Sequence, residues 1–320
     1  MPKIPRLGTT DTETEGDDGW APDLGPTSPP PALPEIVEPD HPYSPVRHLA
    51  YALQPNHDPD ELLMVMFTAY FDASGHPKQK DEMSLSGFVA TVGQWQHFER
   101  CWADHLKRWR IFVPFHMADF EASFAKQDNY KHFPYAHFHR KGKKMDRFLA
   151  ESVTLLNHCT QYSFGEVCVI PEMRRAQREG SFPAWEPYTY LGFMILHKTF
   201  LWARQMARNG HASDQLEIIF ECGDPGWEQL RRVAKAAFNT EIHCKSKDKL
   251  VPFQACDIVA WEHRKNIEMH YGGATSGRPS MGQMLEALKG SDDWQYLHYQ
   301  SIAETSASPE WQELVKNAPV

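Results

Sequence analysis

Four acidic residues of this 320-residue chain lie at the end of an apolar segment or inside one. Asp72 follows the run MFTAYF, Asp119 closes the turn FHMAD, Glu221 ends the run LEIIF, and Asp257 interrupts the apolar stretch 250–260. Carboxylates that converge on one site repel each other unless a cation lies among them. Hard oxygen ligands favour Mg²⁺ or Mn²⁺ over zinc. If the four acids converge, they form a divalent-metal site of the kind that hydrolyses phosphodiester bonds.

The place of each residue in the chain suggests its role. Asp72, Glu221 and Asp257 are the predicted ligands of one or two ions. Asp119 would complete the ligand cage or orient the attacking water. His116 stands three residues before Asp119, a spacing that puts both side chains on one face of a helical turn. His116 is therefore the predicted proton shuttle, or the group that orients Asp119.

Each acid also has a plainer structural interpretation. Asp72 begins the sequence Asp-Ala-Ser-Gly, and since Asp and Gly are ordinary turn residues, it serves equally well as a turn cap. Asp224 lies three residues after Glu221 and can replace it as a ligand. Ser74 is expected to cap the turn, because no His–acid pair adjoins it in the sequence to activate a nucleophile.

Hydrophobic periodicity predicts the elements that must position these acids. Apolar runs rich in β-branched and aromatic residues predict strands, the first two pairing as an antiparallel hairpin, at 65–72, 83–92, 162–170, 215–221 and 240–244. Apolar residues at helical spacing predict helices at 94–110, 143–157, 188–208 and 226–238, with another that begins at Pro252. The segment 171–183 is polar and no element is predicted there. Short helices are predicted at 280–289, 292–303 and 309–316.

Two basic segments are candidates for nucleic-acid contact. In the first, lysines and arginine are interleaved with aromatic residues, which together can contact phosphates and stack bases. The second leads into the last long helix. A solvated loop is the competing interpretation of both, because charge runs are usually solvated. The candidate contacts are Arg140, Lys141, Lys245, Lys247 and Lys249.

The composition is that of a soluble globular protein with reduced thiols. Six cysteines are scattered without paired spacing, which suits a cytoplasmic protein. No segment approaches the ~20 apolar residues of a membrane span, and the N-terminus has no apolar leader. No cysteine stands at zinc-ligand spacing from His132, His137 and His139, so zinc is not expected. The net charge of −9 argues only weakly against a nucleic-acid partner, since a local basic groove needs few residues.

Three short motifs, in order, resemble the Domain of Unknown Function 3800 family. Tyr70–Gly75 is similar to its opening, in which tyrosine or isoleucine precedes aspartate, glutamate, serine and glycine. Phe115–Asp119 resembles its second motif, a histidine followed three residues on by an acid. Gln254–Ala260 resembles its closing helix, glutamine-x-alanine-aspartate-x-x-alanine, and the strand that ends at Glu221 stands where the family has another acid. The likeness spans about residues 65–268.

This resemblance implies an RNase H-like α/β fold, a mixed sheet flanked by helices, and a metal-dependent nuclease activity in a bacterial protein. The implied cofactor is Mg²⁺ or Mn²⁺, and the implied partner is DNA or RNA. Two positions depart from the family pattern. Ala73 replaces its glutamate, although successive strand residues point to opposite faces, which would place residue 73 away from the ligands. Cys256 replaces a small alanine.

Three domains follow: a tail at 1–48, the RNase H-like domain at 49–270 and a helical extension at 271–320. The tail holds 11 of the 24 prolines, and such a segment buries too little surface to fold, so disorder is expected. It is a candidate site for a protein partner. Two other functions stay open: a non-catalytic RNase H-like module that binds nucleic acid or protein, and an enzyme acting on a small phosphorylated molecule. No oligomeric state is predicted.

Overall fold

The computed structural model of the chain describes residues 44–56, 66–75, 81–124, 134–139, 141–180, 183–209, 216–272, 285–290, 294–297, 302 and 307–316. Most of the predicted tail lies outside these residues. Helix α1 (Pro45–Leu53) begins four residues before the predicted domain boundary. It begins there because Ser44 caps it, accepting a hydrogen bond from the Arg47 N–H at 3.2 Å, and Pro45 suits the first turn.

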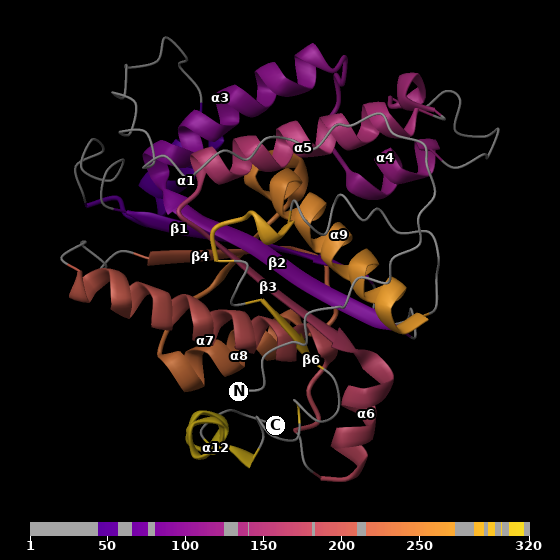
Figure 1. Cartoon of the computed structure of the whole chain (residues 1–320). Helices are drawn as coiled ribbons and strands as arrows, with labels where there is room; N and C mark the ends of the chain where they lie inside the picture. Colours follow the sequence, from indigo (N-terminus) through magenta and orange to yellow (C-terminus); the bar gives the residue numbers. More distant parts are fainter. Residues whose placement is uncertain are drawn as a thin grey trace. The chain divides into compact units, whose positions relative to one another are not determined.

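A six-stranded mixed sheet forms the centre of the fold, in the order β5-β4-β1-β2-β3-β6 (Figure 1). Strand β2 is antiparallel to both of its neighbours, β1 and β3. Strand β4 is parallel to β1, and β5 is parallel to β4. The strands are β1 (Phe67–Ser74), β2 (Glu82–Thr91), β3 (Tyr162–Val169), β4 (Leu216–Glu221), β5 (His243–Lys245) and β6 (Gln295–Leu297). The predicted α/β fold, a mixed sheet flanked by helices, is confirmed.

Helices cover both faces of this sheet (Figure 1). One face packs against α9 (Pro252–Gly272), beyond which lie α3 (Val92–Arg108), α5 (Gly142–Cys159) and α4 (Met117–Phe124). The other face packs against α7 (Pro187–Arg208), and α8 (Trp227–Phe238) packs against α7. Each interface is lined by buried apolar and aromatic side chains. No helix within the described ranges is both long and apolar enough to cross a bilayer.

Strand β1 lies between β2 and β4, and its alternation separates two kinds of side chain. Phe71 packs in the core under α7, whereas Tyr70 packs in the core under α9. Asp72 therefore leaves the strand on the α9 face, and Ala73 leaves it on the α7 face, where it packs against the core. Gly75 ends the strand with a φ of +94°, and an added Cβ would lie 2.6 Å from the Glu82 carbonyl oxygen. The tight turn thus needs glycine.

Besides α1, for which no helix is predicted, other segments differ from the predictions: the strand predicted at 240–244 begins only at His243. Helix α6 (Ile170–Arg178) forms in the polar segment for which no element is predicted, because its three apolar residues, at spacing i, i+3 and i+6, are enough to bury one face. Strand β6 falls inside the predicted helix 292–303, so a helix over that segment is wrong. The strand pairs with the edge of β3, whose backbone groups would otherwise lack partners. The described residues therefore do not show a purely helical extension, although α12 (Pro309–Lys316) matches the helix predicted at 309–316.

Candidate carboxylate site

Two parallel strands bring Asp72 and Glu221 to the same edge of the sheet. Phe71 of β1 pairs with Phe220 of β4, so the acids that follow them are neighbours in the ladder. Both side chains leave on the α9 face, two residues beyond Tyr70 and Ile219 of the core on that side. Asp72 is buried, with 1% of its surface exposed. The local cause is the apolar run before each acid, which buries the strand up to the carboxylate.

Helix α9 supplies the third acid. Asp257 is buried in the layer between α9 and the sheet, and its Oδ2 accepts a hydrogen bond from the Met117 N–H at 2.7 Å. Met117 is the first residue of α4, and the N–H groups at the start of a helix have no acceptor within the helix. The Asp257 carboxylate is the acceptor for the Met117 N–H. Cys256, which replaces an alanine in the resembled motif, packs on β1 with its Sγ 3.2 Å from the Tyr70 carbonyl oxygen.

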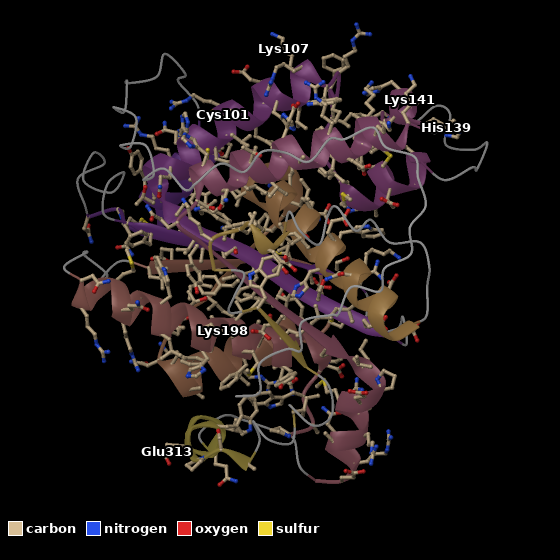
Figure 2. The ribbon with its side chains drawn as sticks, viewed as in Figure 1. Cys101, Lys107, His139, Lys141, Lys198 and Glu313 are labelled. Atoms are coloured by element: carbon tan, nitrogen blue, oxygen red, sulfur yellow. The ribbon has the colours of Figure 1, made fainter. Side chains whose placement is uncertain are left out.

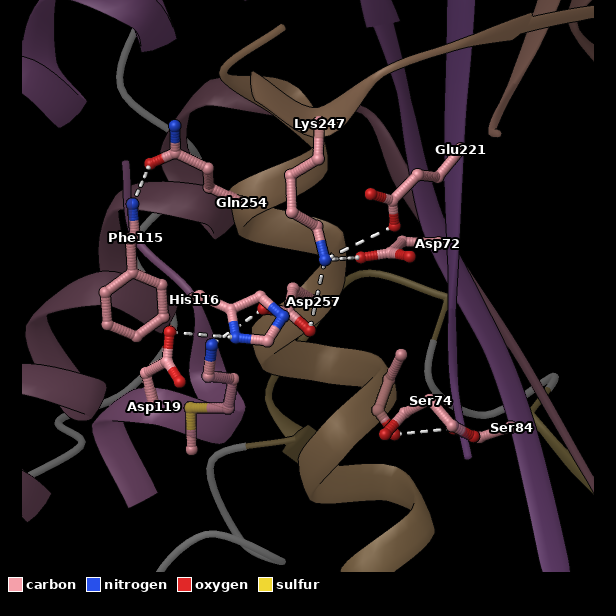
Figure 3. Close-up of polar contacts among 12 residues, drawn as sticks. Asp72, Ser74, Ser84, Phe115, His116, Asp119, Glu221, Lys247, Gln254 and Asp257 are labelled. Atoms are coloured by element: carbon pink, nitrogen blue, oxygen red, sulfur yellow. Dashed lines mark hydrogen bonds and ion pairs between the residues drawn. The ribbon is translucent and has the colours of Figure 1, made fainter. Parts of the chain in front are cut away.

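The Lys247 ammonium lies at the point where the three carboxylates meet (Figure 3). Its Nζ is 2.7 Å from Asp72 Oδ2, 3.3 Å from Glu221 Oε2 and 3.4 Å from Asp257 Oδ1. Lys247 begins the short 3₁₀ helix η3 (Lys247–Lys249), which connects β5 to α9. Three ionised carboxylates around one ammonium leave a local charge of −2 in a largely buried site.

Burial and the neighbouring charges both shift pKa values in the site. Burial raises the pKa of Asp72 well above its ordinary value and the neighbouring Glu221 raises it further, although Lys247 acts in the opposite direction. Burial alone would lower the pKa of Lys247, but Asp72, Asp257 and Glu221 together raise it above the usual lysine value. Burial, with Glu221 nearby, raises the pKa of Asp224 to about 6. Asp224 thus lies beside the site, whereas Glu221 is the acid that contacts the common cation.

The chemistry of the three carboxylates suits a divalent ion, but Lys247 fills the space between them. Asp72 Oδ1 is buried and accepts no hydrogen bond from a described residue, which leaves a donor atom for an ion. Mg²⁺ needs its oxygen ligands at about 2.0–2.1 Å, whereas these oxygens surround an ammonium at 2.7–3.4 Å. Accordingly, within the described ranges no group of three His, Cys, Asp or Glu residues is arranged to hold a metal ion.

The predicted fourth acid, Asp119, lies to one side of this cluster. Its Oδ2 is 3.5 Å from His116 Nδ1, and both side chains are about half exposed. The predicted His116–Asp119 pairing is therefore present, while the ion pairs of Lys247 are made with the other three acids. His116 and Asp119 line a cavity of about 440 Å³, together with Val113, Pro114, Phe115, Pro134, Tyr135 and Lys247. Lys247 thus contacts the three carboxylates and also lines the cavity.

Two roles escaped the sequence prediction. Lys247 was predicted only as a surface contact to nucleic acid. A signal existed, because η3 follows a strand parallel to β4, and the carboxyl ends of parallel strands meet at one sheet edge. The second role belongs to Gln254, whose Oε1 accepts hydrogen bonds from Trp102 Nε1 and the Phe115 N–H, each at 2.9 Å. Gln254 thereby holds the segment that presents Met117 to Asp257.

Among the described residues, none of the other predicted nucleic-acid contacts forms an ion pair with these carboxylates. Lys245 is half-buried on β5, paired in register with Glu221, and Lys249 is exposed on η3. Lys141 is exposed at the start of α5 (Figure 2), and Arg140 lies outside the described residues. His137 and His139 form hydrogen bonds with backbone carbonyls, those of Trp109 at 2.7 Å and Ser123 at 3.0 Å.

Comparisons with known proteins add two distant fold neighbours. No protein-family model and no curated protein sequence matches the chain. Among solved structures, it is similar to the RNase HII of a PCNA:RNase HII complex from Archaeoglobus fulgidus, with 13% identity, a TM-score of 0.33 and coverage of 69% of this chain and 87% of that one. It is also similar to Bst-RNase HIII in complex with Mn²⁺, with 11% identity, a TM-score of 0.33 and coverage of 81% and 72%. Likeness this distant says nothing of what this chain binds or cleaves.

Proposed function

We propose that the chain hydrolyses phosphodiester bonds of DNA or RNA with a divalent ion, Mg²⁺ or Mn²⁺, held by Asp72, Glu221 and Asp257. The observation that carries the proposal is the convergence of these three acids, from three separate elements, on one cation position. Carboxylates that gather in a largely buried site raise the free energy of the folded chain, so their gathering calls for a function. The resemblance of the three sequence motifs to the Domain of Unknown Function 3800 family implies the same reaction.

The residues around the ion position have separable tasks. A bound divalent ion would polarise the scissile phosphate and lower the pKa of a water molecule. Asp72, Glu221 and Asp257 would hold that ion, and the Met117 N–H fixes the orientation of Asp257. His116 faces the cavity beside Asp119, where its imidazole can receive the proton of the attacking water or return one to the leaving oxygen. Asp119 orients His116 in this role.

A basic surface next to the cavity is suited to the phosphate backbone. Exposed basic side chains gather where α3 ends and α5 begins, and Lys107 and Lys141 mark its two parts in Figure 2. Tyr135 joins this surface to the site, because it lines the cavity and begins the turn that carries η2 (Ala136–Phe138). Phe138 lies 4.8 Å below the Lys144 ammonium. The exposed basic residues are Lys107, Arg108, Arg110, Lys141, Lys143 and Arg147.

Cleavage assays test the proposal. Purified protein is incubated with labelled single- and double-stranded DNA and RNA in Mg²⁺, in Mn²⁺ and in chelator. Asp72→Asn and Asp257→Asn are expected to abolish a metal-dependent cleavage that the wild type shows. Asp104→Asn, at an exposed position on α3, is the matched control and should cleave like the wild type. The proposal is refuted if the wild type cleaves none of these nucleic acids in Mg²⁺ and none in Mn²⁺.

One observation favours a second function, a non-catalytic module that binds nucleic acid. The Lys247 ammonium already offsets part of the charge of the three carboxylates, so the fold does not require a metal ion at this point. A protein that binds labelled nucleic acid through its basic surface, without cleaving it in Mg²⁺ or Mn²⁺, would have this function.

A further inference from the structure

The side chain of Lys247 has two sets of neighbours, the carboxylates and the cavity residues. Its ammonium is the common partner of three carboxylates, and its side chain also lines the cavity that His116 and Asp119 border. Lys249, two residues further on the same turn, is exposed and forms no ion pair with a residue in the described ranges. The position of the ammonium is therefore specific to residue 247.

The backbone that carries Lys247 is held on both sides. The Cys222 N–H donates to the Lys245 carbonyl oxygen at 3.0 Å, which ties the preceding strand to the end of β4. On the other side, Leu250 is buried, and its carbonyl oxygen accepts from the Phe253 N–H at 3.2 Å where α9 begins. The long side chain of Lys247 is thus the part that can move, while its Cα stays in place.

A divalent ion and the ammonium cannot occupy this site together. An ion that binds the same three atoms, Asp72 Oδ2, Glu221 Oε2 and Asp257 Oδ1, at about 2.1 Å would take the position between them that Nζ fills. Binding of the ion therefore requires that Nζ leave the carboxylates. The cavity of about 440 Å³ that Lys247 already lines has room for the displaced side chain.

We infer that Lys247 is an internal competitor of the divalent ion: its ammonium compensates the carboxylates in the metal-free protein, and the ion binds by displacing it into the cavity. The inference rests on the proposed function, which assigns the ion to Asp72, Glu221 and Asp257. Displacement places a positive charge on the wall of the cavity where the substrate phosphate would enter. Metal loading and substrate attraction are thus coupled through one side chain.

Metal binding and thermal unfolding test this competition without an activity assay. Mn²⁺ is titrated into the full chain, and free Mn²⁺ is followed by its electron paramagnetic resonance signal. Lys247→Met keeps the apolar stem and removes the charge, so we expect Mn²⁺ to bind about tenfold tighter or more than to the wild type. In chelator, this variant should melt about 5 °C or more below the wild type, and Mn²⁺ should restore its melting temperature. Lys249→Met is the control and should match the wild type in both measurements.

The inference is overturned if Lys247→Met binds Mn²⁺ no tighter than Lys249→Met, or if its metal-free melting temperature equals that of the control. If the variant does not fold in chelator, the double variant Lys247→Met/Asp257→Asn decides. The double variant removes the Asp257 carboxylate together with the Lys247 ammonium, so it should fold without metal. If it does not fold, the instability of Lys247→Met comes from lost packing and the inference is refuted.

These outcomes are separate from those of the cleavage assay. A wild-type chain that cleaves nothing refutes the proposed function, yet tighter Mn²⁺ binding by Lys247→Met would still demonstrate the competition. Conversely, a metal-dependent nuclease whose Lys247→Met variant binds Mn²⁺ no tighter would refute the competition alone.

Discussion

The two faces of the sheet each bury a lysine among carboxylates, and they do so in different proportions. On the α7 face, Lys198 forms an ion pair with Glu166, a fully buried residue of β3. On the α9 face, Lys247 lies among Asp72, Glu221 and Asp257. The ion pair at Lys198 joins one ammonium to one carboxylate, whereas the ammonium of Lys247 meets three carboxylates.

This difference separates a structural ion pair from a site built to accept another ligand. A balanced buried pair gains little from a further cation, and removal of either partner leaves one charge buried without compensation. An unbalanced cluster keeps an attraction for cations even after its lysine is in place. The excess of carboxylates at Lys247, rather than burial alone, is the basis of the function proposed for the α9 face.

The largest expected effect is loss of the Lys198–Glu166 ion pair. Lys198→Met removes the ammonium that pairs with the buried Glu166 carboxylate, so we expect the free energy of unfolding to fall by about 3–5 kcal/mol. Mn²⁺ should not restore it, because this ion pair contributes one carboxylate, whereas three carboxylates surround Lys247. Urea unfolding with and without Mn²⁺ measures both quantities. Recovery with Mn²⁺ would show that the two lysines are equivalent and would break the comparison.

A smaller effect, of opposite sign, is expected from removing a carboxylate at the unbalanced site. Asp72→Asn lowers the excess charge from two to one, and burial already disfavours the ionised form of Asp72. We expect the metal-free protein to gain about 1 kcal/mol in free energy of unfolding while cleavage falls about a hundredfold or more. Glu166→Gln is the matched variant on the α7 face. It should lose stability, since it removes the carboxylate that pairs with the Lys198 ammonium.

A third way to bury a titratable group is to keep it neutral, and His263 on α9 does so. Burial lowers the pKa of His263 to about 3, with the charge of Lys198 acting in the same direction. As the pH falls, this histidine binds a proton near pH 6.5 in the unfolded chain but only near pH 3 in the folded chain. The folded chain therefore loses stability relative to the unfolded chain between pH 6.5 and about 3. Between pH 6.5 and 4.5, this one residue accounts for about 2–3 kcal/mol of the loss.

His263→Phe tests this pH dependence with little change in packing. The imidazole lies 4.8 Å from the Trp294 ring, and its Nδ1 forms no hydrogen bond with a described residue, so phenylalanine can replace it. Urea unfolding from pH 8 to 4.5 should show a shallower decline for the variant. Parallel curves for variant and wild type would mean that other histidines carry the acid sensitivity.

The strands and their acids were predictable because each rests on a local pattern. The apolar run that ends at Asp72 specifies a buried strand, and the turn at Gly75 specifies where it stops. The same holds for β4 and Glu221. Asp257 was predictable because an acid inside an apolar helix face needs a partner. Convergence of the three acids depends on strand order and on the placement of α9, which no local pattern encodes.

The rest of the site depends on contacts between distant segments. The FHMAD motif predicted Asp119 as a ligand, yet the Met117 N–H is the group of this turn that reaches Asp257. Backbone donors carry no signature in the residue type, so that contact was invisible in the sequence. Lys247 was recognised as a cation, but its partners lie 175, 26 and 10 residues away along the chain, a separation that only the fold resolves.

The smallest expected effect concerns Ala73, where the resembled family has a glutamate. Ala73 faces α7 and packs against the core on that side, opposite to Asp72. A glutamate here would not reach the α9 face, so Ala73→Glu should leave Mn²⁺ affinity within about twofold of the wild type while costing about 1 kcal/mol of stability. Calorimetric titration and urea unfolding measure the two. Tenfold tighter Mn²⁺ binding would mean that residue 73 reaches the ion, and the separation of ligand face from core face drawn from β1 would have to be abandoned.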